Sequence, residues 1–284
     1  MSPTRLYAYL IDNAATTQLL FYATIMISVW MAEKLILVNF ASSKWQHTSI
    51  NALFIIPALP IQILLFECST KTANWTTIHH WGLINHLPHA NNPIVKYLVA
   101  FFILDLLDYV YHFLMHKVPF FWRFHLVHHT DRTVDVSTTL REHPGETLIR
   151  NCFLILWIFL TGASVGALIL RQGVESFANI FAHTSFRLPR WPAQILGWLF
   201  VTPNFHHVHH HYQMPATNCN FGDVFSIWDR LFSTTMHLEA AETQFGLDSH
   251  WQDHFDHDWP ALLICSFATP QYEADMPSTD GISL

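Results

Sequence analysis

The chain is organised around one stretch, Asp108-Tyr-Val-Tyr-His112-Phe-Leu-Met-His116-Lys-Val-Pro-Phe-Phe-Trp-Arg-Phe-His125-Leu-Val-His128-His129. Two of its histidines are four residues apart and three follow an i, i+3, i+4 pattern, so on a helix the members of each set share one face. The second pattern returns downstream as His206-His-Val-His209-His210. Neutral imidazoles repeated on several segments are suitable ligands for iron, copper, zinc or nickel ions.

The composition indicates a membrane protein. The chain is 51% hydrophobic and only 12% charged, whereas a soluble globular chain carries about 25% charged residues. Lys and Arg together number 14 and do not cluster, which argues against nucleic-acid binding. The four cysteines show neither metal-type spacing nor a disulfide framework. The N-terminus lacks a basic start and a small-residue cleavage site, so we expect no removable signal peptide.

The first half of the chain contains two apolar runs. Residues 17–40 are long enough to cross about 30 Å of hydrocarbon, and Glu33 near their end predicts that this end lies at the headgroups. Residues 50–66 form a second run that two prolines would kink. Residues 67–92 are predicted to be a polar loop. Its histidines are interpreted as exposed, namely His79, His80, His86 and His89.

A third span is predicted from Pro93 to His116. It contains Asp105 and Asp108, and carboxylates at membrane depth usually face a protein interior. Asp108 and His112 are four residues apart, so the carboxylate is expected to hold the imidazole of a ligand from behind. The alternative is a carboxylate that extends to the membrane interface.

Residues 147–185 are apolar again but too long for one helix. We expect a membrane hairpin that breaks at residues 161–164, with residues 171–173 as the alternative break. The histidine motifs before and after this segment must lie on one side of the membrane to meet, and a hairpin keeps them there. Basic residues in the same compartment predict, by the positive-inside rule, that this side is cytoplasmic.

The predicted fold class is all-α, a polytopic membrane helical bundle with a cytoplasmic histidine-rich cap that holds a dimetal site. We divide the chain into N-terminal transmembrane helices and loop at 1–92, a catalytic domain at 93–235 with the membrane hairpin 147–186, and a soluble C-terminal tail at 236–284. Within this tail, residues 248–258 mix Asp and His and are interpreted as a solvated segment.

Eight histidines of the motifs are candidate metal ligands: His112, His116, His125, His128, His129, His206, His209 and His210. Two five- or six-coordinate metals need more donors than this or bridging water. His183 is the best further candidate, and the alternative is a histidine that caps the end of a helix. His143 comes next. His207 and His211 lie off the ligand face of the last motif and are expected to bond to carboxylates or water.

An all-imidazole set of ligands narrows the choice of metal. Calcium and magnesium prefer oxygen ligands, and structural zinc is four-coordinate and usually bound by thiolates. Two iron ions that activate O2 fit better, and their chemistry calls for a buried apolar pocket. A lipid substrate is expected to enter from the bilayer. Residues of the third span either line such a pocket or only pack, namely Phe101, Phe102, Leu106 and Tyr109.

This arrangement of motifs in a hydrophobic chain resembles the fatty acid hydroxylase / sterol desaturase superfamily of membrane di-iron oxygenases. The resemblance covers roughly residues 95–235 and includes the residues around the motifs. The similar stretches are Asp105-Leu-Leu-Asp108, Phe121-Trp-Arg-Phe-His125, Asp135 to Pro144, His183-Thr-Ser-Phe-Arg187-Leu-Pro189, Asn220-Phe-Gly222 and Ser226 to Phe232. The chain departs from the pattern at Phe113, Glu142 and Ser185, which bears on the substrate more than on the chemistry.

The resemblance implies an O2-dependent enzyme with two iron ions that hydroxylates or desaturates a lipid in lipid biosynthesis. It carries over the eight motif histidines as iron ligands, with His183 as a ninth, and we expect Asp108, His143 and Asp229 to support the ligands from behind. No cytochrome b5 domain is visible, so electrons are expected from a separate ferredoxin, cytochrome b5-type protein or flavoprotein reductase.

Two other functions remain as alternatives. A membrane metal-binding or metal-transport protein would place histidines and carboxylates along a path through the bilayer. A haem-binding cytochrome would place histidine pairs on facing helices. The histidines of this chain cluster at one end of its spans, which favours the oxygenase.

Overall fold

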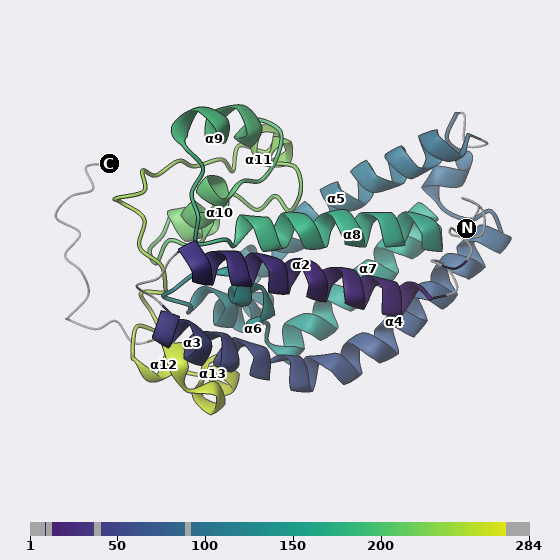
Figure 1. Ribbon diagram of the computed structural model, residues 1–284. Helices are drawn as coiled ribbons and strands as arrows, with labels where there is room; N and C mark the ends of the chain where they lie inside the picture. The colour runs from purple at the N-terminus through teal and green to yellow at the C-terminus, as the bar shows by residue number, and fades with distance from the viewer. Residues whose placement is uncertain (1–8, 10–12, 37–40, 89–91, 271–284) are drawn as a thin grey trace.

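The protein is all-helical, as predicted. A computed structural model describes residues 9, 13–36, 41–88 and 92–270. Within them lie the helices α2 (Ala14–Ile36), α3 (Ala41–Leu53), α4 (Ile55–Ile78), η2 (Leu83–His86), α5 (Pro93–Lys117), α6 (Pro119–His129), η3 (Val136–Leu140), α7 (Pro144–Thr161), α8 (Val165–Ala182), α9 (Arg190–Gly197), α10 (Pro203–His209), η4 (Ala216–Asn218), α11 (Ile227–Leu231), α12 (His254–His257) and α13 (Trp259–Cys265). The long helices form a bundle, and the short helices α6 and α9 to α13 gather at one end as a cap (Figure 1).

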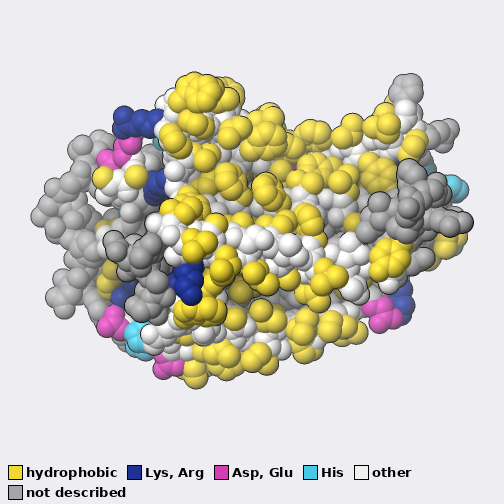
Figure 2. Space-filling model, viewed as in Figure 1, with side chains coloured by type: hydrophobic (Ala, Val, Ile, Leu, Met, Phe, Trp, Pro, Cys, Tyr) yellow, Lys and Arg dark blue, Asp and Glu magenta, His cyan; other side chains and the backbone are white. Residues whose placement is uncertain are grey.

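The bundle carries the membrane-crossing part of the chain. Among the described residues, α2 and α5 are long and apolar enough to span a bilayer, and α3 with α4 passes the same test as one span bent by 42°. Large apolar side chains of α2 are exposed, including Leu20 and Ile27 at 62% each. Figure 2 shows hydrophobic side chains spread over this face, with charged ones toward its ends. The chain is therefore an integral membrane protein.

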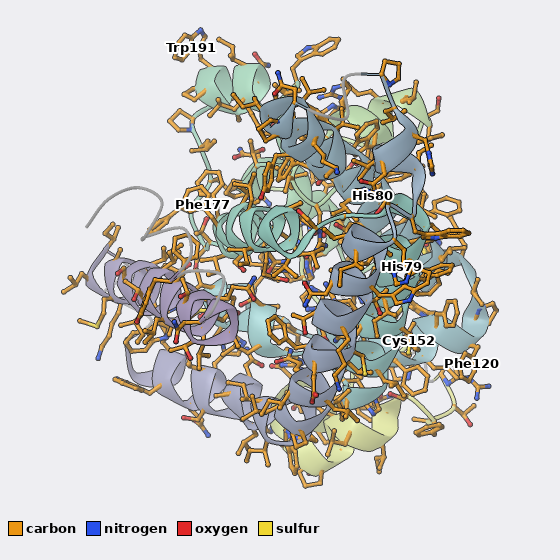
Figure 3. All side chains as sticks on the ribbon, turned by 90° about the vertical axis from the view of Figure 1, so that its right-hand side faces the viewer. His79, His80, Phe120, Cys152, Phe177 and Trp191 are labelled. Atoms are coloured by element: carbon orange, nitrogen blue, oxygen red, sulfur yellow. The ribbon has the colours of Figure 1, made fainter. Side chains whose placement is uncertain are left out.

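The predicted polar loop at 67–92 is partly wrong, because α4 continues to Ile78. Its threonines turn their hydroxyls back to the helix, as Thr72 does to the carbonyl of Cys68 at 2.8 Å, so these polar side chains are satisfied within a helix. The exposed loop histidines are confirmed for His79 and His80, which lie past the end of α4 (Figure 3), and for His86. His89 lies outside the described residues.

The hairpin forms at the first of the two breaks considered. α7 ends at Thr161 and α8 begins at Val165. Gly162 between them has a φ of 76°, and a Cβ there would lie 2.2 Å from the carbonyl oxygen of Trp81, so this turn requires glycine. The alternative break at residues 171–173 lies inside α8. The hairpin returns the chain to the cap, where α6 and α10 meet.

The predicted solvated segment 248–258 is only partly confirmed, because Asp253, His254, His257 and Asp258 are exposed whereas two other residues are buried. Phe255 is buried in one cluster with Leu126 and Val127 of α6, and its carbonyl oxygen accepts a hydrogen bond from the buried Arg141 at 2.9 Å. His250 is buried as well. The few apolar residues of this segment are spread among charges without a helical period, so the sequence pattern conceals that they cover α6.

Candidate metal centre

Nine histidines converge in the cap and form two groups. The first group comprises His112, His116, His125, His129 and His209, and the second group comprises His128, His183, His206 and His210. Within each group the ring nitrogens that the residues offer lie within 4.8 Å of one another. The two groups are neighbours, because the rings of His129 and His210 stack with centroids 4.7 Å apart. The nine histidines are those that the sequence singles out.

Helical geometry divides each HxxHH motif between the two groups. On α6, His125 and His129 belong to the first group and His128 to the second. On α10 the assignment is reversed, since His206 and His210 belong to the second group and His209 to the first. Positions i+3 and i+4 lie about 100° apart around a helix, so one motif can serve two adjacent centres.

Backbone carbonyls fix the orientation of several rings. The Nδ1 atoms of His112, His183 and His209 lie 2.9, 2.8 and 2.7 Å from the carbonyl oxygens of Phe221, Asn179 and Cys219, respectively. A carbonyl oxygen only accepts hydrogen bonds, so each Nδ1 carries the proton and each Nε2 presents a lone pair. This is the tautomer that a metal ligand with a bonded second nitrogen adopts.

These lone pairs face one another at short range. The Nε2 atom of His183 lies 3.1 Å from that of His128, 3.0 Å from that of His206 and 3.2 Å from that of His210. Donors so closely spaced fit around one ion with metal–nitrogen bonds of about 2.0–2.1 Å. In the first group, both ring nitrogens of His116 and Nε2 of His209 are buried and have no hydrogen-bond partner among the described residues. Both groups therefore fit a metal ion.

Burial keeps these imidazoles neutral. It lowers the pKa of His209 to about 3 and the pKa of His183 to about 4. Burial also lowers the pKa of His206 and of His210, and the adjacent imidazoles lower it further. A ligand must be deprotonated to bind a metal, so both groups are ready to bind at neutral pH.

A carboxylate that the sequence analysis did not single out supports the first group. Oε1 of Glu146 lies 2.8 Å from Nδ1 of His125 and accepts a second hydrogen bond from Arg150 at 3.0 Å. Glu146 lies in the first turn of α7, directly after the Arg141–Pro144 motif. An acidic residue in the first turn of a helix that begins directly after this motif is the sequence signal that could have identified Glu146.

Asp108 does not hold His112, contrary to expectation. Its carboxylate pairs with Arg171 of α8, at 2.8 Å from Nε, and Arg171 also pairs with Glu175 at 2.9 Å. Arg171 is a buried charge that needs a partner, and its guanidinium takes the carboxylate of Asp108 away from the ring one turn later. The carbonyl oxygen of Phe221 takes that place instead.

His143 does not support a ligand either. It caps α7, accepting a hydrogen bond from the backbone N–H of Gly145 at 2.9 Å, while its Nε2 lies 3.2 Å from the carbonyl oxygen of Leu263. The reason is local, because Pro144 begins α7 and the preceding residue becomes its cap.

Asp229 supports His112 indirectly, through the backbone of Phe221. Its carboxylate accepts hydrogen bonds from the backbone N–H groups of Phe221 at 2.7 Å and Gly222 at 2.8 Å. Burial raises the pKa of Asp229 to about 6. The residue thus fixes the turn whose carbonyl oxygen orients His112.

His207 and His211 lie outside both groups, as expected from their position on α10. The Nε2 atom of His207 lies 2.9 Å from the carbonyl oxygen of Thr184, and its Nδ1 accepts a hydrogen bond from Arg187. Nδ1 of His211 accepts from the backbone N–H of Gln244 at 3.2 Å. Among the described residues, these partners are backbone groups and an arginine, not the predicted carboxylates.

The second group is tied to the N-terminal helices by Glu33, which is fully buried. Its carboxylate accepts hydrogen bonds from the backbone N–H of Ser185 and from Lys44 Nζ, both at 2.7 Å. Lys44 also pairs with Asp135 at 2.6 Å. Since Ser185 follows His183 by two residues, this buried ion network holds the segment that carries a candidate ligand.

Comparison with known proteins gives a consistent result. Residues 97–234 match the family model for fatty acid hydroxylases. An alkylglycerol monooxygenase of Caenorhabditis elegans is 32% identical over 49% of this chain and 26% of its own length. The ornithine lipid hydroxylase OlsE of Rhizobium tropici is 29% identical over 55% of this chain and 44% of its own length. A cholesterol 25-hydroxylase of Rattus norvegicus is 26% identical over 56% of this chain and 54% of its own length.

The chain thus spans between a quarter and about half of the length of these relatives. No solved structure matches it significantly. The matched residues contain all nine histidines of the two groups, together with Glu146 and Asp229. Residues 97–234 therefore belong to the fatty acid hydroxylase / sterol desaturase superfamily.

Proposed function

We propose that the protein is a membrane-bound, O2-dependent oxidoreductase that hydroxylates a lipid, with one iron ion in each histidine group. The observation that carries this proposal is the convergence of Nε2 lone pairs 3.0–3.2 Å apart in the second group, beside a first group of five more imidazoles. The names of the relatives, which describe lipid hydroxylases and a monooxygenase, support it.

The donor set favours iron over other metals. All nine candidate donors are imidazole nitrogens, which suit iron and other transition metals and are poor partners for calcium or magnesium. When bound, iron supplies the one-electron chemistry by which O2 is activated. The chain's own residues keep the imidazoles neutral, orient them through backbone carbonyls and Glu146, and surround them with buried aromatic rings such as Phe221.

Hydroxylation is proposed rather than desaturation, because the relatives are named as hydroxylases or a monooxygenase. Insertion of one oxygen atom into a C–H bond consumes O2, two electrons and two protons and releases water. We propose that the electrons come from a separate donor, which is a ferredoxin, a cytochrome b5-type protein or a flavoprotein reductase.

We further propose that the cap faces the cytoplasm. Lys117 ends α5 at the cap, and Arg123, Arg132 and Arg187 lie in the segments that follow in the same compartment. The positive-inside rule assigns such a side to the cytoplasm.

The test combines metal analysis with isotope incorporation. Full-length protein purified without oxygen is expected to contain iron and, with a reductant and O2, to transfer heavy oxygen from labelled O2 into lipids of its host membrane. His128→Ala should abolish this transfer while the protein stays folded. His79→Ala, at an exposed residue directly past the end of α4 and outside both histidine groups, is the control. Oxidation that survives His128→Ala would overturn the proposal, and metal uptake into vesicles without oxidation would favour transport instead.

A further inference from the structure

A groove runs between α2 and α8 beside the second group. Its volume is about 380 Å³, which lies within the usual range for ligand sites. The walls are almost wholly apolar, with Val29 and Ala32 from α2 and the stacked rings of Phe177 and Phe181 from α8. Ser28 adds a small side chain to the α2 wall.

The groove deepens toward the metal centre. Phe177 at its rim is 53% exposed (Figure 3), whereas Ile180 is fully buried and Thr184 is 3% exposed. Thr184 follows His183 directly, and Pro203 in the same wall lies three residues before His206. The inner end therefore abuts the backbone segments that carry two ligands of the second group.

The mouth of the groove opens on the surface that faces lipid. Ile27 on α2 and Leu170 and Val174 on α8 are exposed, and hydrophobic side chains cover this side (Figure 2). An apolar cavity offers water no hydrogen-bond partners, and a cavity that opens on the bilayer is continuous with hydrocarbon. A hydrocarbon chain is therefore the natural occupant.

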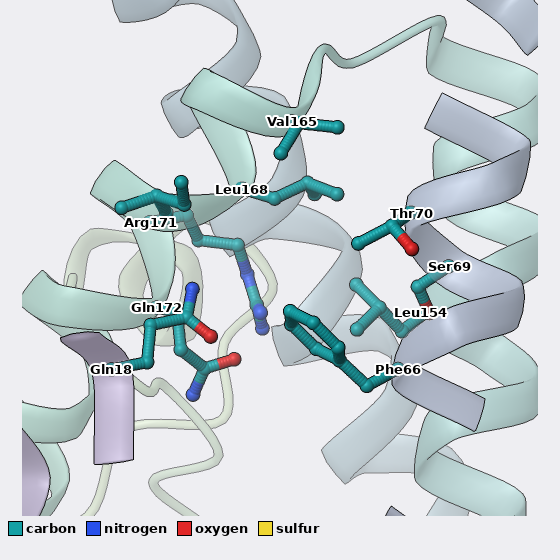
Figure 4. A pocket seen from close by; sticks show the side chains of 10 residues that line it. Gln18, Phe66, Ser69, Thr70, Leu154, Val165, Leu168, Arg171 and Gln172 are labelled. Atoms are coloured by element: carbon teal, nitrogen blue, oxygen red, sulfur yellow. The ribbon is translucent and has the colours of Figure 1, made fainter. Parts of the chain in front are cut away.

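A second cavity, farther from the cap, has different chemistry (Figure 4). Its volume is only about 30 Å³, and Arg171, Gln18, Gln172 and Ser69 contribute polar groups to its wall. Its arginine is already paired with Asp108 and Glu175. It offers no room for a lipid chain, which leaves the groove between α2 and α8 as the better candidate of the two.

We propose that this groove binds one flexible hydrocarbon chain of a membrane lipid, which enters sideways between α2 and α8 with its reacting end next to the second group. A single chain fits better than a fused-ring lipid because α2 and α8 pack along each other, and packed helices lie only about 8–10 Å apart. That the bound chain is the one oxidised rests on the proposed function. One wall comes from α2, outside residues 97–234, so part of the substrate choice lies beyond the family-matching region.

The test measures occupancy without turnover. Full-length protein is placed in nanodiscs with a phosphatidylcholine that carries a diazirine near the end of one acyl chain, irradiated, and digested for mass spectrometry. Labels are expected on the buried wall around Ile180, Thr184 and Pro203. Ser28→Trp should lower this labelling about tenfold by filling the groove, whereas Ile27→Trp, one residue away on the lipid-facing side, should leave it unchanged.

Ala32→Phe is a second plugging variant in case Ser28→Trp does not fold, and it should lower labelling to the same extent. The inference is overturned if labelling is unchanged in both plugging variants, or if a sterol diazirine labels this wall more strongly than the acyl probe does. The two proposals fail separately. A labelled groove in an iron-loaded protein that oxidises no lipid would refute the oxygenase alone, and oxidation by a protein with an unlabelled groove would refute the groove alone.

Discussion

The two histidine groups differ in how they are built. The first takes five histidines from α5, α6 and α10, and its supports, Glu146 and the carbonyl oxygens of Phe221 and Cys219, all lie within residues 97–234. The second has four histidines, lies beside the groove, and is braced by Glu33 and Lys44, outside those residues. The first centre is thus enclosed by the family-matching region, whereas the second depends on the N-terminal helices.

This contrast suggests that the two histidine groups have different roles. In the first group, five nitrogens inside a surrounding of Trp122 and Phe221 rings would hold a metal ion firmly. The second group offers only four nitrogens, one fewer than the first, and lies on the side where the hydrocarbon chain is proposed to arrive. We therefore expect the second centre to be the weaker metal site and the one that responds to changes in α2.

Removal of one ligand from each group should have the largest effect. His210→Ala leaves three donors in the second group and is expected to lose that ion, whereas His116→Ala leaves four in the first group and should retain a weakened ion. Lipid oxidation should fall more than about 100-fold in both. Iron per chain after dialysis separates the two cases, and equal iron loss in both variants would mean that the number of donors does not distinguish the groups.

Glu146→Gln should weaken the first group selectively. Loss of the charge behind His125 removes the partner that raises the ligand's basicity, which typically costs about 10–100-fold in metal affinity. Competition with a chelator measures this affinity. Glu142→Gln is a matched control, because Glu142 shares Arg150 but bonds to Thr147 rather than to an imidazole. A comparable loss in both variants would show that the effect comes through Arg150 instead.

Glu33→Gln should weaken metal binding in the second group, but less than Glu146→Gln weakens it in the first. The hydrogen bond from Ser185 weakens, so the His183 segment loosens and the second ion is expected to bind about tenfold less tightly. The first ion should be unchanged. Glu67→Gln removes a glutamate from an exposed ion pair with Lys71 and serves as control. Loss of the first ion instead would contradict the division of supports between the two centres.

The sequence predicts local features of this site well. The helix period alone shows that His112 and His116 lie on one face, and the glycine in residues 161–164 marks the hairpin turn. Which histidine joins which group was not predicted, because that depends on how α6 and α10 are rotated against each other. A motif fixes spacing along one helix and carries no information on the angle between two helices.

Supports from distant segments were also missed. From the sequence alone, Glu33 is interpreted as the polar end of a membrane span, because the sequence does not show its partners Lys44 and Ser185. Asp108 is likewise interpreted as the partner of His112, because its partner Arg171 lies on another helix. Buried charges require partners, but the sequence does not show which segment supplies them. The convergence of the nine candidate ligands could therefore be predicted from the sequence, whereas most of the residues that orient them could not.

Phe221→Leu should have the smallest effect and tests the aromatic enclosure of the first group. The fully buried ring of Phe221 contacts His112, His116 and His209, with centroids 5.1–5.8 Å away. Leucine keeps the backbone carbonyl that holds His112 but leaves a gap, so we expect a loss of about 1–1.5 kcal/mol in stability and about a threefold loss in affinity for the first ion.

The matched control is Phe225→Leu. Phe225 is also buried but packs on Phe101, Phe102 and Phe200, and its ring stacks on no histidine of the described residues. Thermal unfolding should show similar destabilisation of both variants, while the optical or Mössbauer signature of the first ion should change only with Phe221→Leu. If both variants leave that signature intact, the rings around the first group act only as packing, and the firm hold on its ion comes from the five imidazoles and Glu146 alone.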